Sequence, residues 1–537
     1  MSFSTLDYTI FIAYCLLILG VGLFVSRVKK GVKKSAEDYF LASKSLPWWA
    51  VGASLIAANI SAEQFIGMSG SGFVVGLAIA SYEWMGAITL LIVGKFFLPV
   101  FIKQGLYTIP GFIEKRYSSQ LKTILAVFWV ALFVFVNLTS VLYLGSLALE
   151  TILGVPMIYG VMGLAVFAAA YSLYGGLSAV AWTDVIQVVF LVLGGLITTY
   201  LALNIVSGGD GMLKGFSQLL ETTPKRFNMI LSPENDQYIN LPGIWVLIGG
   251  LWVANLYYWG FNQYIIQRTL AAKSINEAQK GIAFAAFLKL IIPFIVVIPG
   301  IATYVIVNDP EMLQSVSQAS AALPNMEQAD RAYPWLLQLL PSGLKGIAVA
   351  ALAAAIVSSL ASMLNSTSTI FTMDIYVPYF SKNKSQDEST VRVGRITAVV
   401  ALIIAGMIAP LLGRLDQAFQ FIQEYTGIVS PGILAIFLMG LFWKKTTNKG
   451  AIWGALVSIP IALLLKGLPD FPFLHQMGIT FLATMVIIAA VSLWDGKGAN
   501  DPKGIAVDQE TFRTSSTFNV SAVIVLVITA VIYTLFW

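Results

Sequence analysis

Polar side chains interrupt two long apolar runs of this sequence, and their chemistry is that of ligand binding. The stretch ANISAEQFIG (58–67) places Asn59 and Gln64 in a run that is otherwise almost entirely hydrophobic, and GGLWVANLYYWGFNQYIIQR (249–268) contains Asn255. Amides both donate and accept hydrogen bonds, so they suit an uncharged ligand that bears hydroxyl groups. Such residues can also serve only to pack helices together. Two clusters at corresponding places in the chain favour a binding site.

Two charged residues lie inside apolar runs, and each follows an interrupted run by one predicted span. They are Glu83 in SYEWMG and Lys289 in AAFLKLIIPF. A charge at the centre of a bilayer costs roughly 3 kcal/mol or more, so it marks a functional site by default. A structural ion pair between them is the alternative. Asp184 lies near a predicted cytoplasmic end, where its side chain could reach the membrane surface, and ranks lower.

A stripe of small and hydroxyl side chains follows one face of the predicted helix at 350–371. Its members recur at helical spacing: Ala355, Ser358, Ser359, Ser362 and Ser366. Hydroxyl oxygens bind hard alkali cations, and an unwound helix nearby would add free carbonyl oxygens. Together they would form a sodium site without a carboxylate. Close packing of two helices by small residues would explain the same stripe.

Aromatic residues accompany the amides at helical spacing. Asn255, Tyr258 and Trp259 share one face of a helix, as do Phe419 and Gln423 in AFQFIQEYTG. Amides bind hydroxyl groups and aromatic rings cover apolar C–H faces, so the combination suits a neutral polyhydroxylated ligand. Packing of the aromatic rings in the core is the alternative.

The composition indicates that membrane-spanning helices must position these residues. Of the 537 residues, 58% are hydrophobic and 11% are charged, against about 25% charged in soluble proteins. The basic residues stand in short clusters between apolar runs and are not arranged for nucleic acid. Cys15 and His475 are the single cysteine and histidine, so an internal disulfide is impossible and a zinc site is not expected. We expect an all-α integral membrane protein.

A window of about 20 apolar residues finds about fourteen transmembrane helices. Their predicted limits are 7–26, 47–72, 76–102, 121–149, 155–173, 179–203, 244–267, 277–306, 344–373, 393–412, 416–443, 450–466, 474–494 and 517–536. Alternate loops carry the basic clusters, among them RVKKGVKK and WKKTTNK, and by the positive-inside rule these loops are cytoplasmic. An even number of spans then leaves both termini outside.

The two interrupted spans suggest an internal repeat. Unwound helix is tolerated in a bilayer where it lines a cavity, and paired interruptions point to a binding site at the midplane. About five spans separate the interruptions, which fits two five-helix repeats of opposite orientation, each opening with a broken helix. The expected division is an N-terminal helix and basic loop (1–45), first repeat (46–205), extracellular loop (206–243), second repeat (244–443), and three C-terminal helices with a cytoplasmic linker (444–537).

These segments resemble the sodium:solute symporter family, particularly its bacterial sugar-transporting members. The likeness runs from SAEDYFLASKSLPWWAVGASLIAANISAEQFIGMSGSG to the last span and includes YSLYGGLSA and GLFWKKTTNKGAIWGA. The resemblance implies a LeuT-like fold with a 5+5 inverted repeat. It also implies that the protein is not an enzyme but a transporter of the bacterial inner membrane.

The resemblance also implies roles for individual residues. Sugar would be bound by Gln64, Glu83, Asn255, Lys289 and Gln423, with Asn59 nearby. The ring covering the sugar from the cytoplasmic side would be Tyr258, with Trp259 beside it, and the outer gate would be Met68, Tyr82 and Phe419. Sodium would bind the carbonyls of Ala57, Ile60 and Ala355 and the hydroxyls of Ser358 and Ser359. Asp184 would lie on the sodium exit path.

Two residues depart from the family pattern. Gly86 stands where the resemblance leads us to expect a serine near the sugar, and Phe133 stands where we expect a tyrosine. Each change removes a hydroxyl group, which bears on sugar affinity and on the preferred epimer.

The sequence therefore predicts sodium-coupled uptake of a neutral monosaccharide of the galactose or glucose type by alternating access. Alternatives are a sodium symporter for a sialic acid, an amino acid or another organic anion, a transporter-like membrane sensor, and an ion channel. Lys289 could pair with a carboxylate, whereas Glu83 argues against an anionic substrate. The expected partners are sodium, a sugar and the lipid bilayer; the sequence does not predict an oligomeric state.

Overall fold

The computed structural model describes residues 3–25, 44–106, 108–316, 323–381, 388–414 and 417–537, with the backbone but not the side chain at 23, 171–179, 388, 389 and 414. Every regular element in these ranges is a helix; an isolated β-bridge joins Leu46 to Ala272. The basic stretch RVKKGVKK and the segment 35–43 of the family resemblance lie outside the described residues.

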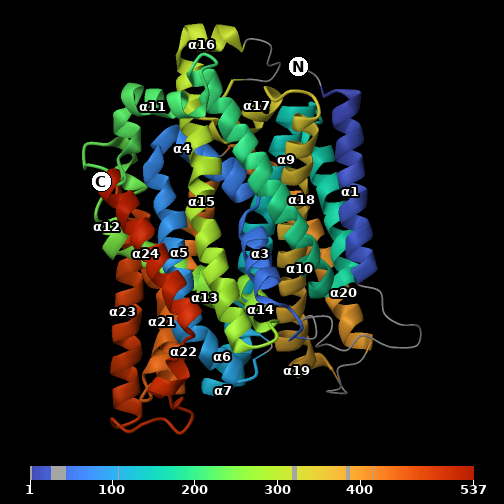
Figure 1. Cartoon of the computed structure of the whole chain (residues 1–537). Helices are drawn as coiled ribbons and strands as arrows, with labels where there is room; N and C mark the ends of the chain where they lie inside the picture. Colours follow the sequence, from blue (N-terminus) through green and yellow to red (C-terminus); the bar gives the residue numbers. More distant parts are fainter. Residues whose placement is uncertain (1–2, 26–43, 107, 317–322, 382–387, 415–416) are drawn as a thin grey trace.

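Long helices make up most of the molecule (Figure 1). They are α1 (Thr5–Val25), α5 (Ser81–Ile92), α8 (Ser119–Leu132), α9 (Thr139–Leu153), α10 (Met157–Val206), α15 (Ile275–Asn308), α18 (Leu344–Ile370), α20 (Glu388–Ile408), α21 (Ala418–Phe442), α22 (Asn448–Lys466), α23 (Phe473–Asp495) and α24 (Ser516–Leu535). Several continue through π-helical or 3-10 turns, such as η5 (Phe133–Leu138) between α8 and α9.

Shorter helices complete the spans or cap the two ends of the bundle. They are α3 (Trp48–Asn59), η2 (Glu63–Met68), α4 (Ser69–Val75), η3 (Leu77–Ala80), η4 (Val93–Phe97), α6 (Leu98–Lys103), α7 (Ile109–Arg116), α11 (Met212–Thr222), η6 (Pro224–Phe227), η7 (Asp236–Ile239), α12 (Trp245–Ile248), α13 (Gly250–Phe261), α14 (Gln263–Leu270), α16 (Pro310–Ser315), η8 (Ala329–Arg331), α17 (Ala332–Gln338), η9 (Phe371–Tyr376), α19 (Val377–Phe380), η10 (Ala409–Arg414) and η11 (Gln509–Phe512).

Within the described residues, eleven helices are long and apolar enough to cross a membrane. Those at the margin of the bundle, such as α1 and α24, expose large apolar side chains along most of their length, whereas α18 is buried almost throughout. Exposed apolar surface of this extent is stable when lipid covers it. The protein is therefore a multi-pass membrane protein, as the composition predicts.

Two spans are broken where the sequence predicts interruptions. α3 ends at Asn59, Ile60 takes an extended conformation, and the chain resumes a helical course at Glu63. α13 ends at Phe261, and Asn262 is extended before α14 begins. The glycine-rich segment 67–72 is itself helical and packs closely on its neighbours, since a Cβ at Gly72 would lie 2.8 Å from the Val297 carbonyl oxygen.

The predicted separation of spans 155–173 and 179–203 is wrong in one respect, because α10 joins them without a non-helical residue. A straight helix from Tyr159 to Gln187 would extend about 42 Å at 1.5 Å per residue. Both residues nevertheless line one cavity. The part of α18 that lines the same cavity is short, Ala353 to Val357, so the cavity does not run the length of a helix of about 42 Å. The helical run therefore turns back on itself between Tyr159 and Gln187, so its two halves lie beside each other.

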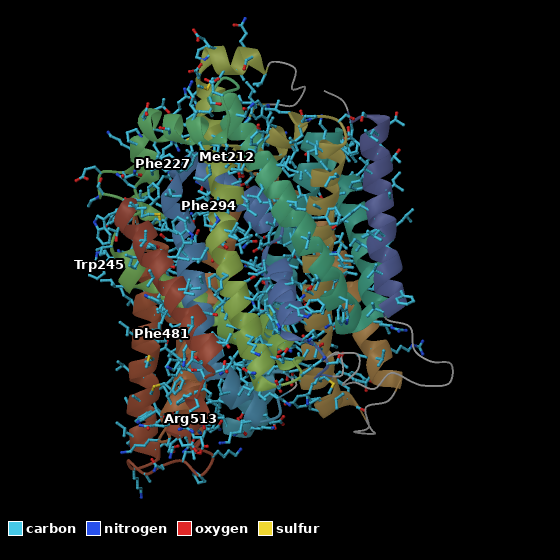
Figure 2. The ribbon with its side chains drawn as sticks, viewed as in Figure 1. Met212, Phe227, Trp245, Phe294, Phe481 and Arg513 are labelled. Carbon is cyan, nitrogen blue, oxygen red and sulfur yellow. The ribbon has the colours of Figure 1, made fainter. Side chains whose placement is uncertain are left out.

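The two ends of the bundle carry different loops. Met212 lies at one end with α11 and α16, and Arg513 lies at the other with α6 and α7 (Figures 1 and 2). Both chain ends belong to the α11 side. Asp7 in α1 accepts hydrogen bonds from the backbone N–H groups of Gly343 and Gly346, and Met229 donates to the Phe536 carbonyl.

The opposite end gathers the segments that the sequence places on the basic side. Arg116, at the end of α7, donates hydrogen bonds to the carbonyls of Gly440 and Thr446 and lies 3.5 Å from Asp501. Lys503 in the 495–514 linker donates to the Tyr117 carbonyl. Backbone carbonyl oxygens thus accept the hydrogen bonds of the buried Arg116 guanidinium group. The contacts of Asp501 and Lys503 hold the linker against the bundle.

Candidate functional site

A cavity lies where the two broken helices meet α5, α15 and α21. Its wall contains all seven residues expected to bind the substrate: Asn59, Gln64, Glu83, Asn255, Tyr258, Lys289 and Gln423. Their separation along the chain exceeds 300 residues, and the fold brings them to one place. Asn255, Tyr258 and Trp259, which the sequence places on one helix face, all line this cavity.

The break after α3 orients Gln64 and releases backbone carbonyls. In a continuous helix the N–H of Ser61 would bond to the Ala57 carbonyl and the N–H of Gln64 to the Ile60 carbonyl. Instead Ser61 N–H is directed to Gln64 Oε1 at 3.2 Å, and Gln64 N–H to the Ser61 carbonyl at 3.2 Å. The carbonyls of Ala57 and Ile60 are thus left without their helical donors, which leaves them available to a cation.

Glu83 and Lys289 form a direct ion pair in the cavity wall. The Lys289 ammonium group donates a hydrogen bond to Glu83 Oε2, and both side chains are almost completely buried. Lys289 Nζ also lies 4.9 Å from the centre of the Trp259 ring. Pairing compensates both charges, so this part of the wall offers polar groups without net charge.

Aromatic side chains bound the cavity on two sides. Tyr82 and Phe419 meet edge to face with ring centres 5.1 Å apart, and both line the cavity. Met68, the third residue expected in this gate, is fully buried but does not line the cavity. On another side Tyr258 accepts hydrogen bonds from Asn59 Nδ2 at 3.0 Å and from the Tyr264 hydroxyl at 2.9 Å.

The serines of the stripe on α18 have different partners: Ser362 Oγ accepts a hydrogen bond from Arg268 Nη2, and Ser366 Oγ donates to Gln267 Oε1 at 3.3 Å. Ser359 Oγ donates to the Ala58 carbonyl at 3.3 Å, so it lies beside the end of α3. Ser358 Oγ donates to Asp184 instead. Ala355 is fully buried one turn earlier on the same helix. The side-chain oxygen of Ser359 and the released carbonyls of α3 therefore lie in the same region, and these donors fit a hard monovalent cation.

The expectation that Asp184 could reach the membrane surface is wrong. Asp184 is fully buried, and Ser54 Oγ donates to its Oδ2 at 2.5 Å. Arg268 Nη2 lies 3.3 Å from the same oxygen, and Arg268 Nε donates to Ser54 Oγ at 2.7 Å. A buried carboxylate requires such partners, and the sequence alone does not show that Arg268 on α14 supplies the countercharge.

Several polar residues in the cavity wall were not predicted from the sequence as binding residues. Glu63, Asn137, Asn262 and Thr426 line the cavity with the expected set. Glu63 and Asn262 lie at the two helix breaks, within the polar stretches 58–67 and 249–268. Their place in these stretches is the sequence feature that could have identified them as cavity residues. Asn137 lies within the π-helical segment η5, shortly before Thr139 and Ser140, and no repeated polar pattern in its sequence neighbourhood marks it.

The two departures from the family pattern occupy different places. A Cβ at Gly86 would lie 3.2 Å from Trp259 Nε1 and 3.3 Å from Asn255 Oδ1, so Gly86 leaves space beside two cavity-lining residues. Phe133 is fully buried and packs edge to face on Tyr264, with ring centres 5.7 Å apart. Gly86 therefore affects the cavity directly, whereas Phe133 contacts a neighbour of Tyr258.

Comparison of coordinates shows the fold. The chain matches the structure of a Na⁺-coupled sialic acid symporter in a substrate-bound outward-open state with a TM-score of 0.78 at 24% identity, covering 92% of this chain and 98% of that one. It matches Mhp1, a nucleobase-cation-symport-1 family transporter, in a closed conformation with a TM-score of 0.51 at 14% identity, covering 91% and 99%. The chain thus shares the LeuT-like fold of these transporters.

Comparison of sequences shows the family. The chain is 66% identical to the sodium/glucose cotransporter of Vibrio parahaemolyticus over 99% of this chain and 98% of that protein. It is 32% identical to the human sodium/myo-inositol cotransporter 2 over 85% of this chain and 69% of that protein. The model of the sodium:solute symporter family matches residues 39–458. The chain belongs to the sodium:solute symporter family.

Proposed function

We propose that this protein couples inward movement of sodium to uptake of a neutral monosaccharide of the galactose or glucose type. The observation that carries the proposal is the cavity at the two helix breaks. Its wall combines amides, a self-compensated ion pair and aromatic rings, which suits a polyhydroxylated ligand without net charge. The 66% identity to a sodium/glucose cotransporter supports the same substrate class.

Sodium binds where α3 ends against α18. Its ligands are the carbonyls of Ala57, Ile60 and Ala355 and the hydroxyls of Ser358 and Ser359. The support for this site is the release of the Ala57 and Ile60 carbonyls and the position of Ser359 Oγ at 3.3 Å from the Ala58 carbonyl. Ser358 donates its hydroxyl proton to Asp184, which leaves the lone pairs of its oxygen free for the ion. Asp184, already hydrogen-bonded to this hydroxyl, is well placed to receive the ion on its way out.

Coupling follows from the shared helix break. Sodium fixes the end of α3 against α18, and the same break positions Asn59 and Gln64 for the sugar. Sodium therefore raises sugar affinity, and by linkage sugar raises sodium affinity by the same factor. Tyr82, Phe419 and Met68 close the outer side, and Tyr258 with Trp259 closes the inner side, so that rocking of the repeats exposes the sugar to one side at a time.

The coupling of one sodium ion is energetically sufficient for useful uptake. Moving one charge through about 100 mV is worth roughly 2.3 kcal/mol. Because about 1.4 kcal/mol corresponds to a factor of ten, this supports roughly 40-fold accumulation of a neutral sugar. A sodium concentration gradient adds to this figure.

The topology that we propose has fourteen spans and a 5+5 inverted repeat at 46–205 and 244–443. It is supported by the eleven continuous helices together with the two broken helices and the first half of α10. One helix precedes the repeats within 1–45, three follow within 444–537, and 206–243 is an extracellular loop. The protein lies in a bacterial inner membrane with both termini outside, consistent with the cluster of basic residues around Arg116 at the opposite end.

Competition of solutes against labelled galactose tests the substrate class. Purified protein in liposomes with an inward sodium gradient should take up labelled galactose, and unlabelled galactose or glucose should inhibit uptake. Inhibition by sialic acid or amino acids but not by sugars would favour the anion alternative, although Lys289 is already paired with Glu83 in this wall. Sodium flux that is insensitive to sugar would indicate a channel, and the absence of any sodium or sugar flux would favour a sensor.

A further inference from the structure

An apolar groove lies between α1 and the helices α9, α10 and α18, at the margin of the bundle (Figure 1). It is the cavity that Tyr159 and Gln187 share, and we call it the α1 groove. Its rim is open, since Leu16 and Tyr159 are 63% and 64% exposed, whereas Ile18 and Val357 in its floor are 2% exposed. The rim belongs to the apolar surface that lipid covers, so a ligand would enter the groove from the bilayer.

Gln187 brings an amide to the wall of this apolar groove. The residue is fully buried, and neither its Nε2 nor its Oε1 atom has a hydrogen-bond partner among the described residues. Only Asn365 and Gln420 share this property within the described part of the chain. A buried polar group without a partner is costly, and the hydrocarbon region of a bilayer supplies no bulk water to satisfy it. The groove therefore offers a donor and an acceptor, side by side, to whatever fills it.

A hydroxyl group is the single group that satisfies both atoms of this amide. Its proton is donated to Oε1 of Gln187 while its oxygen accepts a hydrogen bond from Nε2. An ester carbonyl or an ether oxygen only accepts, so Oε1 would stay without a donor. A charged head group is unfavourable, because no charged side chain lines the groove among the described residues. The remainder of the ligand must be apolar to match the aliphatic and aromatic wall.

We propose that the α1 groove binds an uncharged amphiphile from the bilayer, with a hydrocarbon body and one hydroxyl group that bonds to Gln187. The site is separate from the cavity at the two helix breaks, since no described residue lines both. The inference does not depend on which solute or ion the protein transports. Its failure would therefore leave the proposed function intact, and the reverse also holds.

Photolabelling with two matched probes tests the hydroxyl group. Purified full-length protein is placed in nanodiscs of phosphatidylcholine, a lipid without hydroxyl groups. It is irradiated with octanol that carries a diazirine on its chain, or with octane that carries the same diazirine, at equal concentrations in the membrane. Mass spectrometry should find the label on α1 and on the 149–167 segment. Half-maximal labelling of the wild type should need about tenfold less alcohol than alkane, and unlabelled dodecanol should compete with the alcohol.

Three variants locate the binding site. Gln187→Leu removes both polar atoms at similar size, so it should need about tenfold more alcohol for half-maximal labelling and should not distinguish alcohol from alkane. Gln420→Leu is the matched control, because it removes an equally unpartnered amide on α21, outside the groove, and it should label like the wild type. Gly163→Leu fills the groove at a position where a Cβ would meet no atom within 4 Å, and it should reduce labelling by both probes.

Equal labelling of the wild type and Gln187→Leu by the alcohol would overturn the inference, because water or nothing would then satisfy the amide. Equal labelling of the wild type by alcohol and alkane would overturn it as well, since acyl chains of the bilayer would then simply fill the groove. This second comparison needs no variant, so it decides the question even if Gln187→Leu does not fold. Unchanged labelling of Gly163→Leu by both probes would place the bound alcohol outside the groove.

Discussion

Lys289 on α15 donates a hydrogen bond to the carboxylate of Glu83 on α5, and this ion pair forms part of the wall of the substrate cavity. The two residues are 206 positions apart in the chain. The sequence leaves open whether they bind substrate or only stabilise each other. The structure shows both features together: the pair is formed, and it faces the cavity.

Disrupting this pair separates its two roles. Removing one partner of a buried pair leaves an unpaired charge and costs roughly 3–5 kcal/mol. We therefore expect Glu83→Gln and Lys289→Met each to lower the melting temperature and to abolish galactose uptake. The double variant has no unpaired charge, so its melting temperature should recover while uptake does not. Lys122→Met is the control, since Lys122 pairs with Glu114 outside the cavity, and it should retain sugar affinity.

Recovery of uptake in the double variant would contradict a substrate-binding role for the pair. Uptake is measured in liposomes, and the melting temperature from tryptophan fluorescence in detergent.

Removing the hydroxyl of Ser359 should weaken sodium dependence. A hydrogen-bonding group that faces a charged ligand contributes roughly 1.5–3 kcal/mol. Ser359→Ala should therefore raise the sodium concentration for half-maximal uptake by about tenfold or more. Thr367→Val is the control on the same helix, because the Thr367 hydroxyl bonds within α18 to the Met363 carbonyl. If both variants and the wild type need the same sodium concentration for half-maximal uptake, Ser359 is not a ligand of the ion.

A side chain at position 86 should change sugar selectivity. A Cβ there would lie within 3.2 Å of Trp259 Nε1 and 3.3 Å of Asn255 Oδ1, so both neighbours must shift by a few tenths of an ångström. Gly86→Ser also adds a hydroxyl group to the cavity. We expect the ratio of galactose to glucose uptake to change several-fold, since about 1.4 kcal/mol is worth a factor of ten. Gly86→Ala separates the steric effect from the hydroxyl, and unchanged ratios in both would show that Gly86 does not face the sugar.

The stability of the protein should depend on pH through Asp330. This residue lies in η8, directly before α17, and its Oδ2 accepts a hydrogen bond from the N–H of Ala418 at 2.9 Å. Burial raises the pKa of Asp330 to about 7, from an ordinary value of 3.8, although the hydrogen bond from Ala418 favours the ionised form. Between about pH 4 and pH 7 the unfolded chain therefore loses a proton that the folded protein retains, so stability falls as pH rises.

The matched variant Asp330→Asn cannot ionise and should lack this component. We expect the melting temperature of the wild type, relative to that of Asp330→Asn, to fall between pH 4 and pH 7 and to level off above pH 7. A difference that does not vary with pH, or that rises, would contradict the raised pKa.

The positions of the helix breaks could be predicted from the sequence, because both depend on local features. Polar residues at 59–64 and at 255–262 interrupt apolar runs, and the structure breaks at Ile60 and at Asn262. The seven residues expected to bind the substrate follow from the same local patterns together with the family resemblance, whereas Asn137 and Thr426 of the cavity wall do not. The continuous helical assignment of α10 did not follow, since the sequence predicts two separate spans there.

Charge compensation could not be predicted, because it depends on which segments meet in three dimensions. Asp184 lies near the end of its predicted span, yet Arg268 from another helix and Ser54 from a third surround it. Conversely, Glu63 lies in the motif that first indicated a site, but its lack of a partner is visible only when its neighbours are known. Hydrophobic periodicity identifies spans and does not identify ion pairs.

Sugar-dependent sodium uptake tests the central claim most directly. Purified protein is placed in liposomes, an inward ²²Na⁺ gradient is applied, and galactose, glucose and other monosaccharides are added in turn. The account predicts that galactose or glucose accelerates sodium entry, and that collapse of the sodium gradient stops accumulation of the same sugar. Sodium entry that no monosaccharide alters, or sugar accumulation that persists without a sodium gradient, would contradict it.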